Sequence, residues 1–74
     1  MLSKEQYESL KPYIPTLSLF KTTGQWVGGD AVFKIHRAIT GEIPNMSCNS
    51  CRAKVLIELN IMIELYENNN NRGN

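Results

Sequence analysis

The chain has 74 residues, the length of one domain and near the size at which a single core only marginally offsets chain entropy. Hydrophobic residues make up 42% of it, which is too high a fraction for a disordered chain. The formal net charge is +1, with 8 basic and 7 acidic side chains spread along the sequence, so a dedicated binder of nucleic acid or of an anionic membrane is not expected.

The first predicted helix begins after Ser3. This serine is a favourable N-cap, and Gln6 three residues later completes a capping box. Pro12 removes a backbone donor and disfavours helical geometry at the preceding residue, so we expect the helix to end at about Lys11. Residues 13–15 are then expected to form a short extended link.

The next segment, Leu17 to Thr23, is expected to be helical with Leu17 and Phe20 facing inward and Gly24 as its stop, although its threonines suit a strand equally well. A turn follows over residues 25–29. Within it, Trp26 is either a lid on the core or an exposed anchor for a partner. We favour the lid and keep Trp26 among the candidate interface residues.

A well-marked helix is predicted from Ala31 to Thr40, with Asp30 as its N-cap and Gly41 directly after its last residue. Its buried side is expected to consist of apolar residues: Val32, Phe33, Ile35, Ala38 and Ile39. The outward part is expected to be cationic: Lys34, His36 and Arg37.

The segment from Ser47 to Glu67 is the most informative part of the chain, and Ser47 is its expected cap. At about 100° per residue its apolar arc is far wider than the usual single stripe of an amphipathic helix. The centre of the arc comprises Val55, Leu59, Met62 and Tyr66, with Leu56 and Ile63 on one flank and Ile57, Ile61 and Leu65 on the other. A chain of 74 residues has little else to cover this surface. We therefore expect Ile57, Ile61 and Leu65 to dock onto a second copy of the chain or onto a larger protein assembly.

Together these elements predict an all-α fold, a small three- to four-helix domain with a long C-terminal helix. One helical domain is expected over residues 1–67, followed by a flexible, Asn-rich tail over residues 68–74. The apolar run of the last helix is interrupted by Glu58, Asn60 and Glu64, so no membrane span is expected.

Cys48 and Cys51 lie in the expected first turn of the last helix, where free amides and the helix dipole favour thiolates. The favoured interpretation is that both thiols pack as small hydrophobes in the core. A zinc site is the second interpretation. Cys48, Cys51 and His36 supply three ligands, so a closed tetrahedral site would require cysteines from a second copy or a partner. A redox pair is the third, although no strand pattern precedes the motif as it would in a thioredoxin-like unit.

No catalytic residue is expected, because the single histidine has no acidic neighbour in sequence and the serines fall in caps and turns. Apart from zinc, no cofactor is expected. A helix-turn-helix-like nucleic-acid module is an alternative function, in which Lys34, His36, Arg37, Arg52 and Lys54 would form a modest basic patch. A solvated face is the favoured interpretation of these cations.

The layout of the chain resembles that of short proteins of tailed bacteriophages. The resemblance is carried by Gly28-Gly29-Asp30 at a helix start and by Cys48-Asn49-Ser50-Cys51 ahead of a closing hydrophobic helix. It implies no catalytic residue. It does imply a setting, which is an accessory or virion-associated protein made in the host bacterial cytoplasm.

Overall fold

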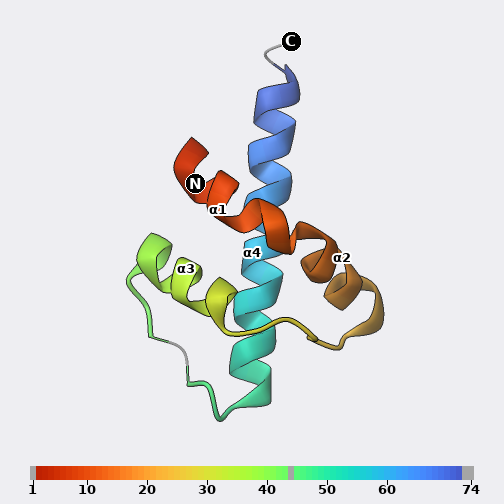
Figure 1. Cartoon of the computed structure of the whole chain (residues 1–74), viewed down its shortest axis with the longest axis vertical. Coiled ribbons are helices and arrows are strands. Elements are labelled where there is room, and N and C mark those ends of the chain that lie inside the picture. The colour runs from red at the N-terminus through yellow and green to blue at the C-terminus, as the bar shows by residue number, and fades with distance from the viewer. Residues whose placement is uncertain (1, 44, 73–74) are drawn as a thin grey trace.

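The computed structural model describes residues 2–43 and 45–72, and the side chains among them up to residue 69 (Figure 1). It contains helix α1 (Lys4–Leu10), a 3₁₀ turn η1 (Lys11–Tyr13), and helices α2 (Ile14–Thr23), α3 (Ala31–Thr40) and α4 (Asn49–Arg72). No strand occurs among the described residues. The prediction of an all-α fold with a long C-terminal helix is therefore confirmed.

Helix α4 is the axis of the molecule. Figure 1 shows it running along the longest dimension, while α1, α2 and α3 lie across its length. Side-chain contacts hold the first two helices on it: the Asn60 side-chain amide donates to the Leu17 carbonyl oxygen at 3.1 Å, and the Tyr7 ring stacks on Tyr66 with centroids 4.3 Å apart. No helix among the described residues is long and apolar enough to cross a bilayer.

The N-terminal capping box forms as predicted. Ser3 Oγ accepts a hydrogen bond from the Gln6 amide at 3.2 Å, and Gln6 Oε1 accepts one from the Ser3 amide at 2.8 Å. The predicted extended link over residues 13–15 is wrong. Pro12 and Pro15 each occupy the first turn of a helical segment, η1 and α2, where a missing N–H leaves no helical bond unmade. The backbone therefore stays helical from α1 to Thr23.

Two glycines end helices as predicted. Gly24 after α2 and Gly41 after α3 adopt left-handed backbone conformations, with φ of 78° and 76°. Their amides bond back to the carbonyl oxygens of Phe20 and Arg37, each at 2.7 Å. Glycine suits both positions because a Cβ atom is disfavoured at positive φ.

We expect Gly24→Ala to lower the free energy of unfolding by about 1–2 kcal/mol, because alanine is strained in the left-handed region. A Cβ atom there would meet nothing within 4 Å, so the loss would come from the backbone alone. Gly29→Ala is the matched control, since Gly29 has neither a positive φ nor a neighbour within 4 Å. Thermal denaturation followed by circular dichroism would compare the two, and equal melting temperatures would contradict the prediction.

The core lies between α1, α2 and α3 and one face of α4. Its buried apolar members are Leu2, Leu10, Leu17, Phe20, Val32, Phe33, Val55, Leu56, Leu59 and Ile63. Leu17 and Phe20 are among them, as predicted. One face of the long helix is thereby covered by three short helices.

Helix α3 has the predicted bounds but a different buried face. His36, expected to point outward, is only 1% exposed, whereas Ala38, expected inside, is exposed. His36 lies one turn after Val32 and three residues after Phe33, so it shares their face of the helix. The Asp30 side chain makes no capping hydrogen bond, and its carbonyl oxygen instead accepts from the amides of Phe33 and Lys34.

Helix α4 differs from expectation at both ends. It begins at Asn49, so Ser47 is not its cap. It continues to Arg72, so the expected helix end at Glu67 is wrong. The division into a domain over residues 1–67 and a flexible tail over residues 68–74 stays a prediction.

Candidate functional site

Three large aliphatic side chains form an exposed row on α4, which we call the α4 stripe: Ile57, Ile61 and Leu65. Their spacing of four residues places them on one side of the helix. Their exposed fractions are 52%, 50% and 50%. Leu59 and Ile63, on the opposite side, are buried against the short helices. The stripe is thus exposed, as the width of the apolar arc predicts, and its role as an interface stays a prediction.

A groove of about 320 Å³ borders the stripe, between α2 and α4. Its lining residues are Phe20, Lys21 and Gly24 from the α2 side and Ile57, Asn60, Ile61 and Glu64 from α4. The Lys21 ammonium group pairs with the Glu64 carboxylate across it, and both side chains are more than half exposed. The stripe therefore adjoins a hollow that has apolar walls and an ion pair.

Trp26 lies half-buried against the core. Its ring meets Phe33 edge-on, with centroids 6.3 Å apart and planes at 81°, and its Nε1 donates to the Gly29 carbonyl oxygen at 3.1 Å. These contacts match the lid interpretation. Trp26 lines a second hollow of about 310 Å³, which shares Phe20 and Gly24 with the α2–α4 groove. Its part in an interface stays a prediction.

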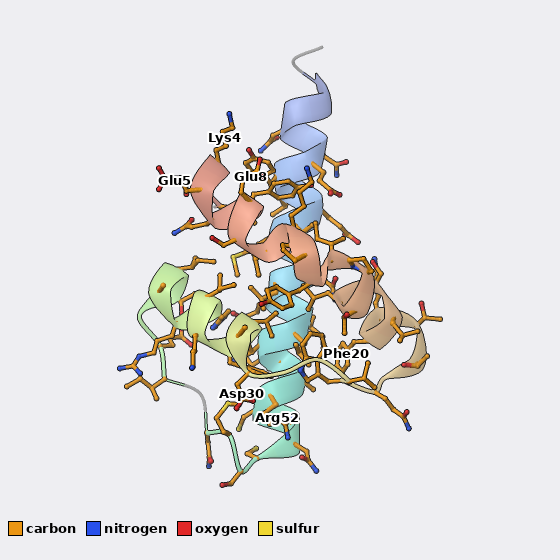
Figure 2. The ribbon with its side chains drawn as sticks, viewed as in Figure 1. Lys4, Glu5, Glu8, Phe20, Asp30 and Arg52 are labelled. Atoms are coloured by element: carbon orange, nitrogen blue, oxygen red, sulfur yellow. The ribbon has the colours of Figure 1, made fainter. Side chains whose placement is uncertain are left out.

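Arg52 also lines this second hollow, near the start of α4 (Figure 2). Its guanidinium carbon lies 5.7 Å from the centre of the Phe33 ring, which is within the range of a cation–π contact. His36 is buried and Arg52 contacts the Phe33 ring, so two of the five members of the alternative basic patch have partners within the fold.

His36 and Glu58 form a pair that was not predicted from the sequence. His36 Nε2 lies 2.9 Å from Glu58 Oε2, and the Glu58 side chain is 37% exposed whereas His36 is buried. The other ring nitrogen, Nδ1, is buried without a hydrogen-bond partner. The sequence did carry a signal for this pair, because Glu58 is the lone acidic residue on the far side of an otherwise apolar arc and so needs a partner there. The pair joins α3 to α4, and among the described residues His36 does not form a three-ligand metal group with Cys48 and Cys51.

Cys48 occupies the cap position of α4 that was predicted for Ser47. The Cys51 amide donates to Cys48 Sγ at 3.2 Å, and Ser50 Oγ lies 3.4 Å from the same sulfur. Both thiols are free and partly exposed, and neither belongs to the core cluster. The expectation that they pack as core hydrophobes is therefore wrong.

The two thiols differ in acidity. Hydrogen bonds from the Cys51 thiol, then from the Ser50 hydroxyl and the Cys51 amide, lower the pKa of Cys48 to about 7. The hydrogen bond with Cys48, followed by desolvation and the negative charge on Cys48, raises the pKa of Cys51. The first proton therefore leaves from Cys48, and the second is held back by the thiolate already formed.

The chain itself provides two ligands for zinc at this position. In the described part of the chain, no group of three or more His, Cys, Asp and Glu side chains is arranged to hold a metal ion. A closed site would thus require ligands from a second chain, as the spacing in sequence suggested.

Comparison with protein families, with characterised proteins and with solved structures finds no significant match to this chain. The fold and the site define its class instead. It is a small all-α protein with one long helix, which carries an exposed aliphatic stripe along its middle and a pair of free thiols at its start.

Proposed function

We propose that this protein acts by binding another protein surface through the α4 stripe, without catalysing a reaction. The observation that carries the proposal is the alignment of Ile57, Ile61 and Leu65, each about half exposed, on one side of one helix. Singly exposed apolar residues are ordinary on a protein surface, whereas a contiguous row indicates an interaction site. The other large exposed hydrophobic residues in the described part of the chain belong to α2 or to the segments between helices: Leu19, Val27, Ile43 and Met46.

The energetics favour a partner that also enters the α2–α4 groove. Full burial of an aliphatic side chain contributes about 1.5–3 kcal/mol, so covering the remaining half of each stripe residue contributes about 0.75–1.5 kcal/mol. Three such residues supply about 2–4.5 kcal/mol, which at most matches the lower end of the cost of association, about 4–15 kcal/mol. The stripe alone would give only weak binding, and filling the groove of about 320 Å³ beside it supplies further apolar contact.

The partner is a second copy of the chain or a component of a larger protein assembly. The resemblance of its layout to that of short proteins of tailed bacteriophages supports an accessory or virion-associated role in the host bacterial cytoplasm. A second copy is the partner to test first, because it requires no other component.

The test is the substitution Ile61→Glu at the centre of the stripe. We expect the apparent mass of the wild type to exceed the mass of one chain, 8.4 kDa, and to rise with protein concentration. The Ile61→Glu variant should keep the mass of one chain at every concentration, because docking would bury an unpaired carboxylate. Analytical ultracentrifugation over a wide range of concentration measures both.

The matched control is Ile43→Glu, which introduces the same charge at a 73% exposed isoleucine in the segment before α4. It should associate like the wild type. If Ile61→Glu also associates like the wild type, the α4 stripe is not the interface. A wild type that stays monomeric at every concentration rules out a second copy as the partner.

A further inference from the structure

We propose that Cys48 and Cys51 form a reversible dithiol–disulfide site at the start of α4, which exchanges with low-molecular-weight disulfides of the glutathione type. The site lies outside the α4 stripe and the groove beside it, so the proposal does not depend on the binding function.

The geometry favours a bond between the two sulfurs. The Cys51 amide donates to Cys48 Sγ at 3.2 Å, so the Cys48 sulfur lies directly over the backbone that carries the Cys51 side chain. Residues three apart on a helix have Cβ atoms about 5–6 Å apart, and a disulfide needs about 3.5–4.5 Å. Closing this gap requires only a local shift, because Cys48 precedes the first helical residue, Asn49.

Both thiols are within reach of a small reagent in solution. Cys48 and Cys51 are free and partly exposed, and both lie outside the buried core cluster. Thiols that are accessible and adjacent to a second thiol are the kind that undergo exchange, whereas buried structural thiols are inert. The shift needed to close the bond also strains it, which favours an exchangeable disulfide over a permanent structural one.

The contacts around the sulfurs assign different roles to the two residues. The Cys51 amide and the Ser50 hydroxyl both lie at hydrogen-bonding distance from Cys48 Sγ, where they stabilise a negative charge. Cys48 is therefore the attacking thiolate and Cys51 the resolving thiol. The lowered pKa of Cys48, about 7, and the raised pKa of Cys51 agree with this order.

The reaction is a balanced two-electron exchange. Cys48 Sγ attacks one sulfur of glutathione disulfide, the S–S bond breaks, and one glutathione leaves as a thiolate that takes up a proton from water. Cys51 then loses its proton to water and attacks Cys48 Sγ, which expels the second glutathione. The chain gives up two electrons and two protons and gains one internal disulfide, and the oxidant becomes two thiols.

The experiment treats the reduced full-length chain with glutathione disulfide at pH 7 in the presence of a metal chelator, and follows the intact mass after acid quenching. The wild type should lose two hydrogen atoms without retaining glutathione. Cys51→Ser should retain one glutathione on Cys48, because no resolving thiol remains. Cys48→Ser should react at least about fivefold more slowly than Cys51→Ser, because in Cys51→Ser the amide of residue 51 and the Ser50 hydroxyl still stabilise a thiolate on Cys48.

Two controls distinguish the effect of the folded geometry on the thiols from the effect of their closeness in sequence. In denaturant the two single variants should react at similar rates, and Leu19→Glu, which introduces a charge at an exposed residue of α2 outside the stripe, should react like the wild type in the folded state. Equal rates of Cys48→Ser and Cys51→Ser in the folded protein would overturn the assigned roles. A folded wild type that keeps glutathione on both cysteines, or fails to react, would overturn the site itself.

Discussion

We expect Leu59→Ala to lower the free energy of unfolding by about 2–5 kcal/mol, the range observed when a fully buried leucine is truncated. Leu59 has no exposed surface and lies on the face of α4 that contacts the three short helices. Truncation removes favourable burial and leaves a cavity, because a close-packed interior relaxes only in part around the missing atoms.

A loss of this size is a large share of the total free energy of unfolding of a domain of this length. Domains have about 0.05–0.15 kcal/mol of stability per residue, which for this length gives about 4–11 kcal/mol. The Leu59→Ala variant should therefore unfold at a much lower urea concentration than the wild type. Urea denaturation followed by far-ultraviolet circular dichroism measures the difference, at a protein concentration where the chain is monomeric.

Ile57→Ala is the matched control for Leu59→Ala, because it removes an aliphatic side chain of the same composition from the same helix. Ile57 is 52% exposed, so its truncation should cost less than about 1 kcal/mol in the monomer. If the two substitutions destabilise the monomer equally, the assignment of the buried and exposed faces of α4 is wrong.

We expect Glu58→Ala to lower the free energy of unfolding by about 1–3 kcal/mol, although it removes a partly exposed side chain. Glu58 Oε2 is the hydrogen-bond partner of His36 Nε2, at 2.9 Å, and the His36 ring is enclosed by the protein. Because the Nδ1 atom already lacks a partner, loss of Glu58 would leave both ring nitrogens unsatisfied. Leaving a buried polar group without a partner costs more free energy than a hydrogen bond contributes on balance.

His36→Leu provides the contrast. It removes both buried nitrogens and places an apolar group beside Val32 and Phe33, and Glu58 can turn to solvent because it is 37% exposed. We expect a change within about 1 kcal/mol, smaller than that of Glu58→Ala. The double variant should resemble His36→Leu alone, which a double-mutant cycle in urea would show.

Glu64→Ala is a further control on the same helix, because Glu64 pairs with Lys21 at a well-exposed position. Its removal should cost less than about 1 kcal/mol, as for surface ion pairs in general. The proposed role of the His36–Glu58 pair fails if His36→Leu destabilises the protein more than Glu58→Ala does.

The helix boundaries that sequence predicted correctly depend on neighbours within a few residues. The capping box of Ser3 and Gln6 and the left-handed glycines after α2 and α3 all form as expected. The two prolines led to a wrong prediction because their effect depends on contacts distant in sequence. Pro12 and Pro15 are compatible with both a break and a first helical turn, and packing of the segment on α4 decides between them.

The candidate sites were predictable in part. The α4 stripe follows from an arc of apolar residues too wide for three short helices to cover, and Ile57, Ile61 and Leu65 are exposed accordingly. The cysteine motif was visible, but the cap role of Cys48 was not, since serine is the better cap by local preference. The capping thiol depends on where α4 begins, and the start of α4 is set by the loop that leads into it.

By itself the sequence determined that the chain is helical, where α1 and α3 begin and end, where α2 ends, and that the last helix carries more apolar surface than the rest can bury. These properties follow from local hydrogen bonding and from the number and spacing of apolar residues. Only the tertiary structure decided that His36 turns inward onto Glu58, that Trp26 lies on Phe33, and that a groove opens beside the stripe. The physical reason is that the His36–Glu58 pair and the groove depend on how helices distant in sequence cross, and the position of the Trp26 ring depends on the path of the loop into α3; both are set by the packing of the whole core.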